Sequence, residues 1–329
     1  MLILPTTILP AGHLFADDGA ASIAAGGLVV MKREPRITMA KEVLKISETK
    51  VVVDYDFRND SDADITTEVA FPIPDYECIQ GERAPSEQGF DDFQLWIDGS
   101  PARYQVEARA FRRGKEFTEL LAGMHVDVAS FGHTPANNNS QDIPKLPAAQ
   151  RRQLEEADLL DHYGQPLWQV RKKYYWQQTF LAHKIVHLRH EYTPALGANN
   201  STSYGMQPKP DPNSAAEIRS FCLDGGLRAL LQQIADGKEK DKSAWYTFVD
   251  FILTTANTWK TPIEDFTLIV ERPQRKSNPN ENKLGDYVSF CWDGPVTKLD
   301  ADHFSAHAVN LVPAKELRIG FFAVEPRRF

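Results

Sequence analysis

The clearest pattern in the chain is an alternation of apolar and polar residues in two runs, residues 51–58 and 65–71. In each run the odd-numbered positions are mostly apolar and the even-numbered positions are mostly polar. A period of two with one apolar face is typical of a half-buried β-strand. The segment between the runs, NDSDAD, favours a turn, so we predict a β-hairpin with one buried face. The expected buried residues are Tyr55, Phe57, Val69 and Phe71, and the more exposed ones are Asp54, Asp56 and Glu68.

Two further features mark the end of this strand pair and the start of the next strand. Pro72 and Pro74 lack the N–H group that a strand ladder needs, so pairing should stop near them. Residues 93–97 alternate again, and the Asp98-Gly99 pair that follows is typical of a tight hairpin turn. We therefore expect a third strand over residues 93–97.

The rest of the chain consists mostly of short apolar runs separated by turn-forming residues, as expected for antiparallel sandwiches. The segments GKEFTELLAGM and PAAQRRQLEEADLLD have helical spacing and composition instead, and short helices are expected in SAAEIRSF and GGLRALLQQIA. We predict a mainly β fold with two antiparallel β-sandwich-like domains and a helical insertion. The predicted segments are a signal-like apolar segment (1–16), an N-terminal β domain (17–110), the helical insertion (111–170) and a C-terminal β domain (171–329).

Length and charge narrow the possible functions. The chain has 329 residues and a formal net charge of −8, with an isoelectric point of about 5.6. Such a chain should have no general affinity for nucleic acid, whose binding draws on clustered Lys and Arg. No run approaches the roughly 18 apolar residues that a bilayer-spanning helix needs. We therefore expect no nucleic-acid partner and no transmembrane span.

The first 16 residues, MLILPTTILPAGHLFA, are apolar and are followed abruptly by DDGAAS. They resemble the apolar core of a signal peptide without its basic leader. The prediction is export to the periplasm or the extracellular space, with cleavage after Ala16. A start codon upstream of Met1 would account for the missing leader. The alternative is a buried N-terminal strand.

The sequence contains three cysteines, Cys78, Cys222 and Cys291, and none of them belongs to a CxxC zinc or redox pair. In an exported chain two of them could form a disulfide bond. Cys222 and Cys291 both lie in the C-terminal half and are the preferred pair. Three buried free thiols are the alternative.

An ordered set of motifs resembles a known family. The motifs are DDGAASIAAGGLV, YDFRNDSDADITTEVAFPIPD, WIDGSP, YYWQQTF, HEYTPALG, LTTANTWKTPIEDFTL and LRIGFF. Together they are similar to a family of exported bacterial proteins catalogued as a domain of unknown function. The resemblance covers most of the chain and implies export and a shared fold, but no activity and no catalytic residues. The incomplete signal peptide departs from the family.

A second likeness is limited to residues 51–99. Two strands, an FPxP end and a strand leading into Asp-Gly resemble the β-sandwich module of vault and inter-α-trypsin inhibitor proteins. Such modules act in adhesion and assembly. The likeness is one of fold only and implies no particular function.

The histidines in AHKIVHLRHEY could bind zinc if the segment were helical, because His183 and His187 would lie one turn apart. The β-branched residues and the following YTP favour a strand instead. In a strand, His187 and His190 point to opposite faces, and His183 lies about 13 Å from His187. Zinc needs its ligand atoms within about 2.2 Å, so we predict no metal site. We expect His183, His187 and Glu191 to form a polar face toward solvent.

The carboxylates Asp54, Asp56 and Glu68 are candidates for hydrolytic chemistry. Alternate residues on one strand face lie about 6.6 Å apart, which overlaps the separation of the two carboxylates in inverting glycosidases. Lys50 and Arg58 share that face. A solvated outer face without catalysis is therefore the alternative.

Trp259, in the segment TANTWKTP, is the candidate binding residue, together with its neighbours Asn257 and Lys260. A turn between two apolar strands should lie at the rim of the sandwich, because its backbone groups need water or local hydrogen bonds. A tryptophan there either covers the core as a lid or contacts a partner. The sequence leaves both alternatives open.

No P-loop, GxGxxG, GxSxG or HExxH motif occurs in the sequence. We therefore predict a non-catalytic binding or assembly module of the bacterial envelope. Its expected partner is an envelope protein or a glycan, and we expect no cofactor. The alternative is a hydrolase that acts on glycans through Asp54 and Asp56.

Overall fold

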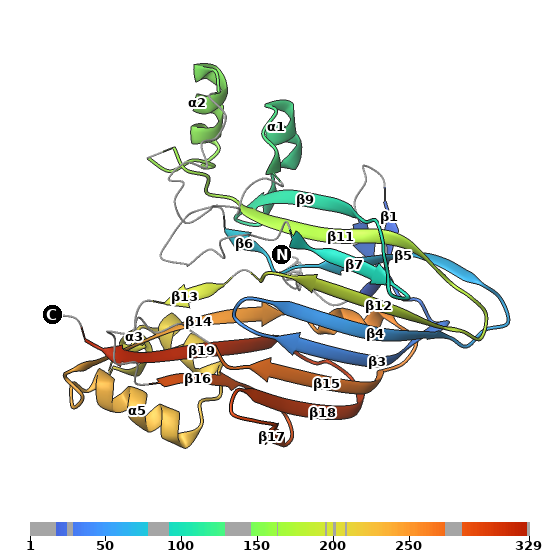
Figure 1. The fold of residues 1–329 in the computed structure, drawn as a ribbon. Coiled ribbons are helices and arrows are strands. Elements are labelled where there is room, and N and C mark those ends of the chain that lie inside the picture. The colour runs from blue at the N-terminus through green and yellow to red at the C-terminus, as the bar shows by residue number, and fades with distance from the viewer. Residues whose placement is uncertain are drawn as a thin grey trace, which may run out of the picture.

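The computed structural model of the protein describes most of the chain and shows a mainly β fold, which confirms the predicted fold class. The described residues are 18–24, 29–77, 92–128, 146–162, 164–194, 196–199, 202–207, 209–273 and 285–327. Within them, the strands form sheets of seven, eight and four strands, here called sheets A, B and C (Figure 1). The signal-like segment and Cys78 lie outside the described residues.

Sheet A has the strand order β10-β9-β11-β5-β1-β2, and β6 pairs with β11. Its strands are β1 (Gly19–Ile23), β2 (Val29–Met31), β5 (Ile65–Pro72), β6 (Tyr76–Glu77), β9 (Gln105–Arg112), β10 (Lys115–Glu116) and β11 (Gln169–Phe180). The segment between β9 and β11 contains α1 (Thr118–Gly123) and α2 (Ala148–Glu156), as expected for the helical insertion. Both helices project away from the sheets (Figure 1).

Sheet B has the strand order β17-β18-β15-β3-β4-β12-β7-β8. Its strands are β3 (Ile37–Ile46), β4 (Val51–Asn59), β7 (Gln94–Ile97), β8 (Ser100–Pro101), β12 (Ile185–Tyr192), β15 (Ile263–Glu271), β17 (Val296–Lys298) and β18 (His303–Leu311). The β7–β8 hairpin turns at Asp98 and Gly99, as predicted. Both residues have positive φ, 48° and 77°, which a two-residue hairpin turn of this type requires and which glycine adopts without strain.

Sheets A and B pack face to face and form the main core. Aromatic side chains from the two sheets meet in this core: the ring centroids of Phe57 on β4 and Phe180 on β11 are 5.9 Å apart, and those of Phe71 on β5 and Tyr192 on β12 are 5.5 Å apart. Tyr55, Phe57, Val69 and Phe71 are all buried, and Asp54, Asp56 and Glu68 are more exposed. The predicted burial of the two runs is therefore confirmed.

The predicted pairing of these two runs is wrong. β4 pairs with β3 and β12 in sheet B, whereas β5 pairs with β1 and β11 in sheet A. The NDSDAD segment therefore crosses from one sheet to the other. An alternation with a period of two indicates which face of a strand is buried, but it does not indicate the strand's pairing partner. Two strands that pack against each other across a core show the same alternation as two strands that pair side by side.

A second crossing runs beside the first one. β11 leads into β12 through residues 181–184, and β11 pairs with β5 while β12 pairs with β4. The side chain of Asn59 links the two crossings, because its Nδ2 donates to the carbonyl oxygens of Ala63 (2.9 Å) and Phe180 (2.9 Å). The Asp64 carboxylate also accepts a hydrogen bond from the backbone N–H of Ala182 at 2.8 Å.

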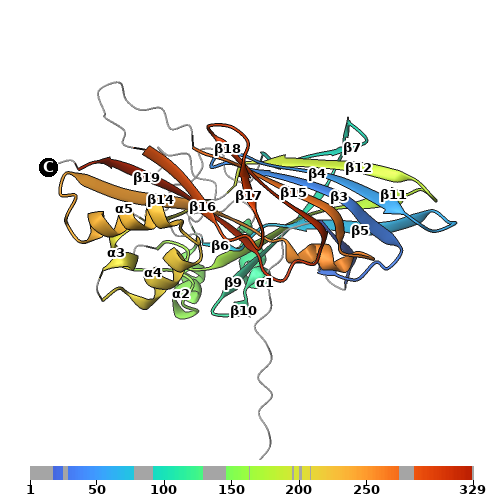
Figure 2. The ribbon, with the colours of Figure 1, turned by 90° about the horizontal axis from the view of Figure 1, so that it is seen from below.

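Sheet C and three helices form a second, smaller core. Its strands, in the order β13-β14-β19-β16, are β13 (Gly197–Asn199), β14 (Lys242–Phe251), β19 (Leu317–Pro326) and β16 (Gly285–Phe290). The helices α3 (Ser203–Met206), α4 (Pro212–Arg219) and α5 (Gly225–Ala235) cover one face of the sheet (Figure 2). Phe221, Tyr246 and Phe322 are buried between the helices and the sheet. The helices expected in SAAEIRSF and GGLRALLQQIA are thus present.

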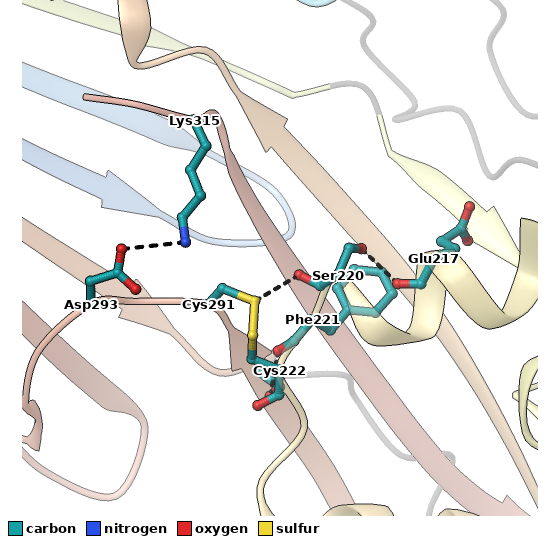
Figure 3. The surroundings of a disulfide bond; sticks show 8 residues. Glu217, Ser220, Phe221, Cys222, Cys291, Asp293 and Lys315 are labelled. Atoms are coloured by element: carbon teal, nitrogen blue, oxygen red, sulfur yellow. Dashed lines mark hydrogen bonds and ion pairs between the residues drawn. A yellow bond between two sulfur atoms is a disulfide. The ribbon is translucent and has the colours of Figure 1, made fainter.

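A disulfide bond joins Cys222 and Cys291, as the preferred pairing predicted, across a sequence separation of 69 residues. It connects the segment between α4 and α5 to the segment that follows β16 (Figure 3). Cys291 Sγ lies 3.2 Å from the carbonyl oxygen of Ser220. The bond therefore fixes the helical layer to the edge of sheet C.

The predicted division into an N-terminal and a C-terminal β domain does not follow the sheets. Sheet B contains β3 and β4 from the first predicted domain and β15 from the second. β15 pairs with β3 in parallel, whereas only antiparallel sheets were expected. Distant strands complete one sheet because each buries its apolar face against the same core, and the order of apolar runs along the chain does not report this pairing.

Candidate functional site

A pocket of about 340 Å³ lies on the outer face of sheet B. The residues that line it are Asp54, Tyr55, Asp56, Trp96, Gly99, His187, Leu188 and Arg189. They belong to three adjacent strands, β4, β12 and β7, and to the turn after β7. Two of the carboxylates and one of the histidines that the sequence singled out thus meet at one place.

Strand alternation and register together place these side chains on one face. Tyr55 and Leu188 are buried, so their polar neighbours on β4 and β12 face outward. In the register of the two strands, Asp54 lies opposite Arg189, and Arg189 lies opposite Trp96 on β7. The sheet therefore presents a row of an acid, a base and an aromatic ring.

The Arg189 guanidinium is the centre of this row. Its Nη1 donates to both oxygens of Asp54, at 2.8 and 3.1 Å, and its Nη2 lies 3.4 Å from Glu191 Oε2. It also lies 5.9 Å from the centre of the Trp96 ring. Partial burial opposes the charge of Arg189, but the hydrogen bonds and charge of Asp54 outweigh it and raise the pKa of Arg189.

The charges continue beyond the pocket along the same face. Lys50 Nζ donates to Glu191 Oε1 at 2.8 Å. This hydrogen bond, with the charges of Lys50 and Arg189, holds the pKa of Glu191 below its usual range. Lys50, Glu191, Arg189 and Asp54 therefore form an alternating chain of charges that fixes the Arg189 side chain.

His187 forms the other half of the pocket. Its Nδ1 lies 2.6 Å from Asp56 Oδ1. The backbone N–H of His187 donates to Asp98 Oδ1 at 2.9 Å, and the N–H of Asp98 donates back to the His187 carbonyl oxygen at 2.8 Å. These bonds hold the β7–β8 turn, and with it Gly99, against β12. The His187 side chain, which lines the pocket, remains 63% exposed.

The structure separates the third candidate carboxylate from the other two. Glu68 lies on β5 in sheet A, opposite Ala21 and Gln177 in the strand register. Asp54 and Asp56 lie on β4 in sheet B. The three carboxylates therefore do not form one site.

The histidines follow the strand prediction in part. His187 faces solvent and His190 faces the core, as predicted from their odd spacing. His183 does not lie on a strand but in the crossing after β11, where its Nε2 lies 2.8 Å from Asp62 Oδ1. Among the described residues, no group of three or more His, Cys, Asp or Glu side chains is arranged to hold a metal ion.

His190 is buried at the centre of the sandwich. Its ring contacts the rings of Tyr55, Phe71 and Trp176, and its Nε2 lies 3.4 Å from Oδ2 of Asp18, which is also fully buried. Burial disfavours the charged imidazole and lowers the pKa of His190 to about 3.

Trp259 is buried, as the lid alternative predicted. The strand before it, β14, ends at Phe251, and Thr254–Thr258 form a 3₁₀ helix between this strand and β15. The Trp259 ring lies 4.7 Å from that of Phe57, and its Nε1 donates to the Asp18 carbonyl oxygen at 2.6 Å. Trp259 therefore holds the start of β1 against the core.

Asn257 and Lys260, the other two binding candidates, are exposed. The Asn257 Nδ2 donates to the carbonyl oxygen of Pro313 at 2.9 Å. Lys260 Nζ donates to Asp60 Oδ2 at 2.9 Å. A binding role for these two residues stays a prediction, and they lie outside the pocket lining.

Sequence reasoning missed Arg189 and Trp96. Arg189 falls between His187 and Glu191 with the same period of two, and Trp96 falls on the polar face of its strand. That period could have assigned both residues to outer faces. It could not have placed β7, β12 and β4 side by side, because Arg189 is 93 residues from Trp96 and 135 residues from Asp54 in sequence.

Comparisons with known proteins agree with part of the expected resemblance. A family model described as a domain of unknown function, DUF4424, matches residues 16–319. No curated protein matches. The expected likeness to the vault and inter-α-trypsin inhibitor module is not among the findings.

Two solved structures are similar over most of this chain. A candidate nutrient-binding protein from Legionella pneumophila is 14% identical, with a TM-score of 0.42 over 94% of this chain and 72% of its own. An M1 zinc metallopeptidase from Deinococcus radiodurans is 9% identical, with a TM-score of 0.27 over 88% of this chain and 43% of its own.

Within the described residues, no helix is long and apolar enough to cross a membrane.

Proposed function

Because the chain belongs to the DUF4424 family, whose description names no function, we propose its function from the pocket on sheet B. The protein is a non-catalytic binding or assembly module of the bacterial envelope, located in the periplasm or outside the cell. Its partner is an envelope protein or a glycan, which it binds through the pocket lined by β4, β12 and β7.

The observation that most supports binding is the internal pairing of the pocket's charges. Asp54 is hydrogen-bonded to Arg189, and Asp56 is hydrogen-bonded to His187. These pairs hold the side chains in place on rigid strands before any partner arrives. A preorganised set of donors and acceptors beside an aromatic ring suits recognition, because little ordering entropy remains to be lost on binding.

The alternative, a hydrolase, receives less support from the same geometry. A glycosidase needs one carboxyl group that stays protonated as the general acid. Asp54 and Asp56 are both partly exposed on an open sheet face, whereas a general acid of this kind lies in a hydrophobic pocket. Each also engages a cationic or ionisable partner that would have to move first.

The disulfide bond supports export. Disulfides persist in oxidising compartments such as the periplasm and are rare in the cytosol. Protein taken from its native host under thiol-blocking conditions should therefore contain the Cys222–Cys291 bond, and its N-terminus should begin at residue 17. Reduced cysteines together with an intact Met1 in a cytoplasmic fraction would overturn the proposed location.

The binding role is tested by capture of material from a native envelope extract. Wild-type protein should retain a component that Trp96→Ala and His187→Ala lose. The matched control is His307→Ala, because His307 is also exposed on the outer face of sheet B and also contacts an aspartate, Asp265. Equal retention by all four proteins would rule out binding through the pocket.

A further inference from the structure

We infer, resting on the proposed binding function, that the pocket on sheet B accepts an uncharged, polyhydroxylated ligand, that is, a neutral glycan. Three features of the pocket support this choice: the internal pairing of its charged side chains, its mixed donors and acceptors, and the aromatic ring at its edge.

The charged side chains of the pocket already have partners within it. Asp54 is bound by Arg189, Glu191 next to it is bound by Lys50, and Asp56 lies 2.6 Å from His187 Nδ1. A charged ligand that took one member of a pair for itself would leave the other member, partly desolvated, without its partner. An uncharged ligand does not compete with these pairs and meets no such cost.

The same side chains still offer hydrogen bonds to a ligand. The side chains of Asp54, Asp56, Arg189 and His187 are 38, 32, 40 and 63% exposed. Carboxylates are acceptors, a guanidinium is a donor only, and the imidazole has a second ring nitrogen besides the Nδ1 that faces Asp56. A sugar hydroxyl both donates and accepts, so adjacent hydroxyls can bond to neighbouring acids and bases without disturbing their pairing.

The aromatic ring supplies the apolar part of the site. Trp96 is half-buried at the edge of the pocket, and the Arg189 guanidinium lies 5.9 Å from the centre of its ring. The ring's amphipathic character suits a ligand with both apolar C–H groups and hydroxyls. The pocket volume of about 340 Å³ falls at the lower end of the range for small-molecule sites, which favours one or two sugar rings at the end or middle of a chain.

The test is a glycan array that contains neutral, anionic and amino-bearing glycans, probed with four proteins: wild type, Trp96→Ala, His187→Ala and His307→Ala. Circular dichroism and the Cys222–Cys291 bond serve as checks that each variant is folded. We expect wild type and His307→Ala to bind neutral glycans. Trp96→Ala should bind them about tenfold more weakly or worse, as loss of a buried aromatic contact does.

The other outcomes contradict the neutral-glycan inference, and they also show whether the proposed binding function fails with it. Binding confined to anionic or amino-bearing glycans contradicts the charge argument. Neutral-glycan binding that Trp96→Ala leaves unchanged places the glycan elsewhere. If no glycan binds while the envelope capture still depends on Trp96, the partner is a protein and only the inference fails. If that capture is also independent of Trp96, the proposed function fails with it.

Discussion

At the scale of single residues, the core contains polar groups whose surroundings control their charge. His190 lies among the rings of Tyr55, Phe71 and Trp176, and the Asp18 carboxylate also faces it. Trp259 bonds to the Asp18 backbone on the same side. The start of β1 is therefore tied to the core by both residues.

His190 should make the fold sensitive to acid. Its folded pKa of about 3 lies below the unfolded value of about 6.5, so between these pH values the unfolded chain binds a proton that the folded chain does not. The contribution of the neutral His190 imidazole to the free energy of unfolding is therefore fully present above pH 6.5. It is lost as the pH falls toward 3, by an amount on the order of 3–5 kcal/mol. Urea titrations of His190→Gln should show a shallower loss between pH 6.5 and 4. A slope equal to that of wild type would contradict the neutral, buried imidazole.

Trp259 should contribute to stability through both packing and its hydrogen bond. Trp259→Phe removes the bond to Asp18 but keeps a ring, so we expect a loss of about 1–2 kcal/mol. Trp259→Ala should cost about 3–5 kcal/mol, because it also leaves a cavity beside Phe57. Lys260→Ala, at an exposed neighbour, is the control and should cost under about 1 kcal/mol. Similar denaturation midpoints for Trp259→Ala and Lys260→Ala would mean that the tryptophan is not part of the core.

At the scale of elements, the two crossings between sheets A and B decide how the strands are arranged. The sequence predicts the buried faces of β4 and β5, because the alternation of residues such as Tyr55 and Asp56 indicates which side chains are buried. It does not predict that β4 pairs with β12, because pairing depends on contacts between segments far apart in the chain. The local turn composition of NDSDAD suits a hairpin and a crossing equally well.

Asn59 should be the most sensitive residue of the crossings. It is fully buried, and Asn59→Ala would leave the carbonyl oxygens of Ala63 and Phe180 without its Nδ2. Loss of these bonds should lower the free energy of unfolding by about 2–3 kcal/mol. Asp62→Ala, in the same crossing but fully exposed, should change it by less than about 0.5 kcal/mol. Equal effects in thermal unfolding would show that Asn59 does not join the crossings.

At the scale of the whole molecule, one sandwich core and one smaller helical core share sheet C, and the disulfide bond belongs to the smaller one. Val249 and Phe251 on β14 face the main core, while Tyr246 and Phe248 face the helices. The pocket lies on the opposite, outer face of sheet B. The parts of the site could be predicted as outward residues of separate strands, but their meeting depends on the order of strands in the whole sheet.

Removal of the disulfide bond should loosen the helical layer more than the sandwich. The bond closes a long loop, with a separation of 69 residues, so the Cys222→Ser/Cys291→Ser double variant should lose about 2–5 kcal/mol. Hydrogen exchange should accelerate in α4 and α5 and change little in β4 and β12. Uniform acceleration across both cores would mean that the two cores unfold as one unit.

The most direct test of binding through the pocket is hydroxyl-radical footprinting of the wild-type protein with and without native envelope extract. Oxidation of Trp96 and His187, read by mass spectrometry, should fall when the extract is present. His307, which is 54% exposed on the same face of sheet B, should be oxidised equally in both samples. Unchanged oxidation at Trp96 and His187, or protection of His307 in their place, would contradict a binding function for the pocket.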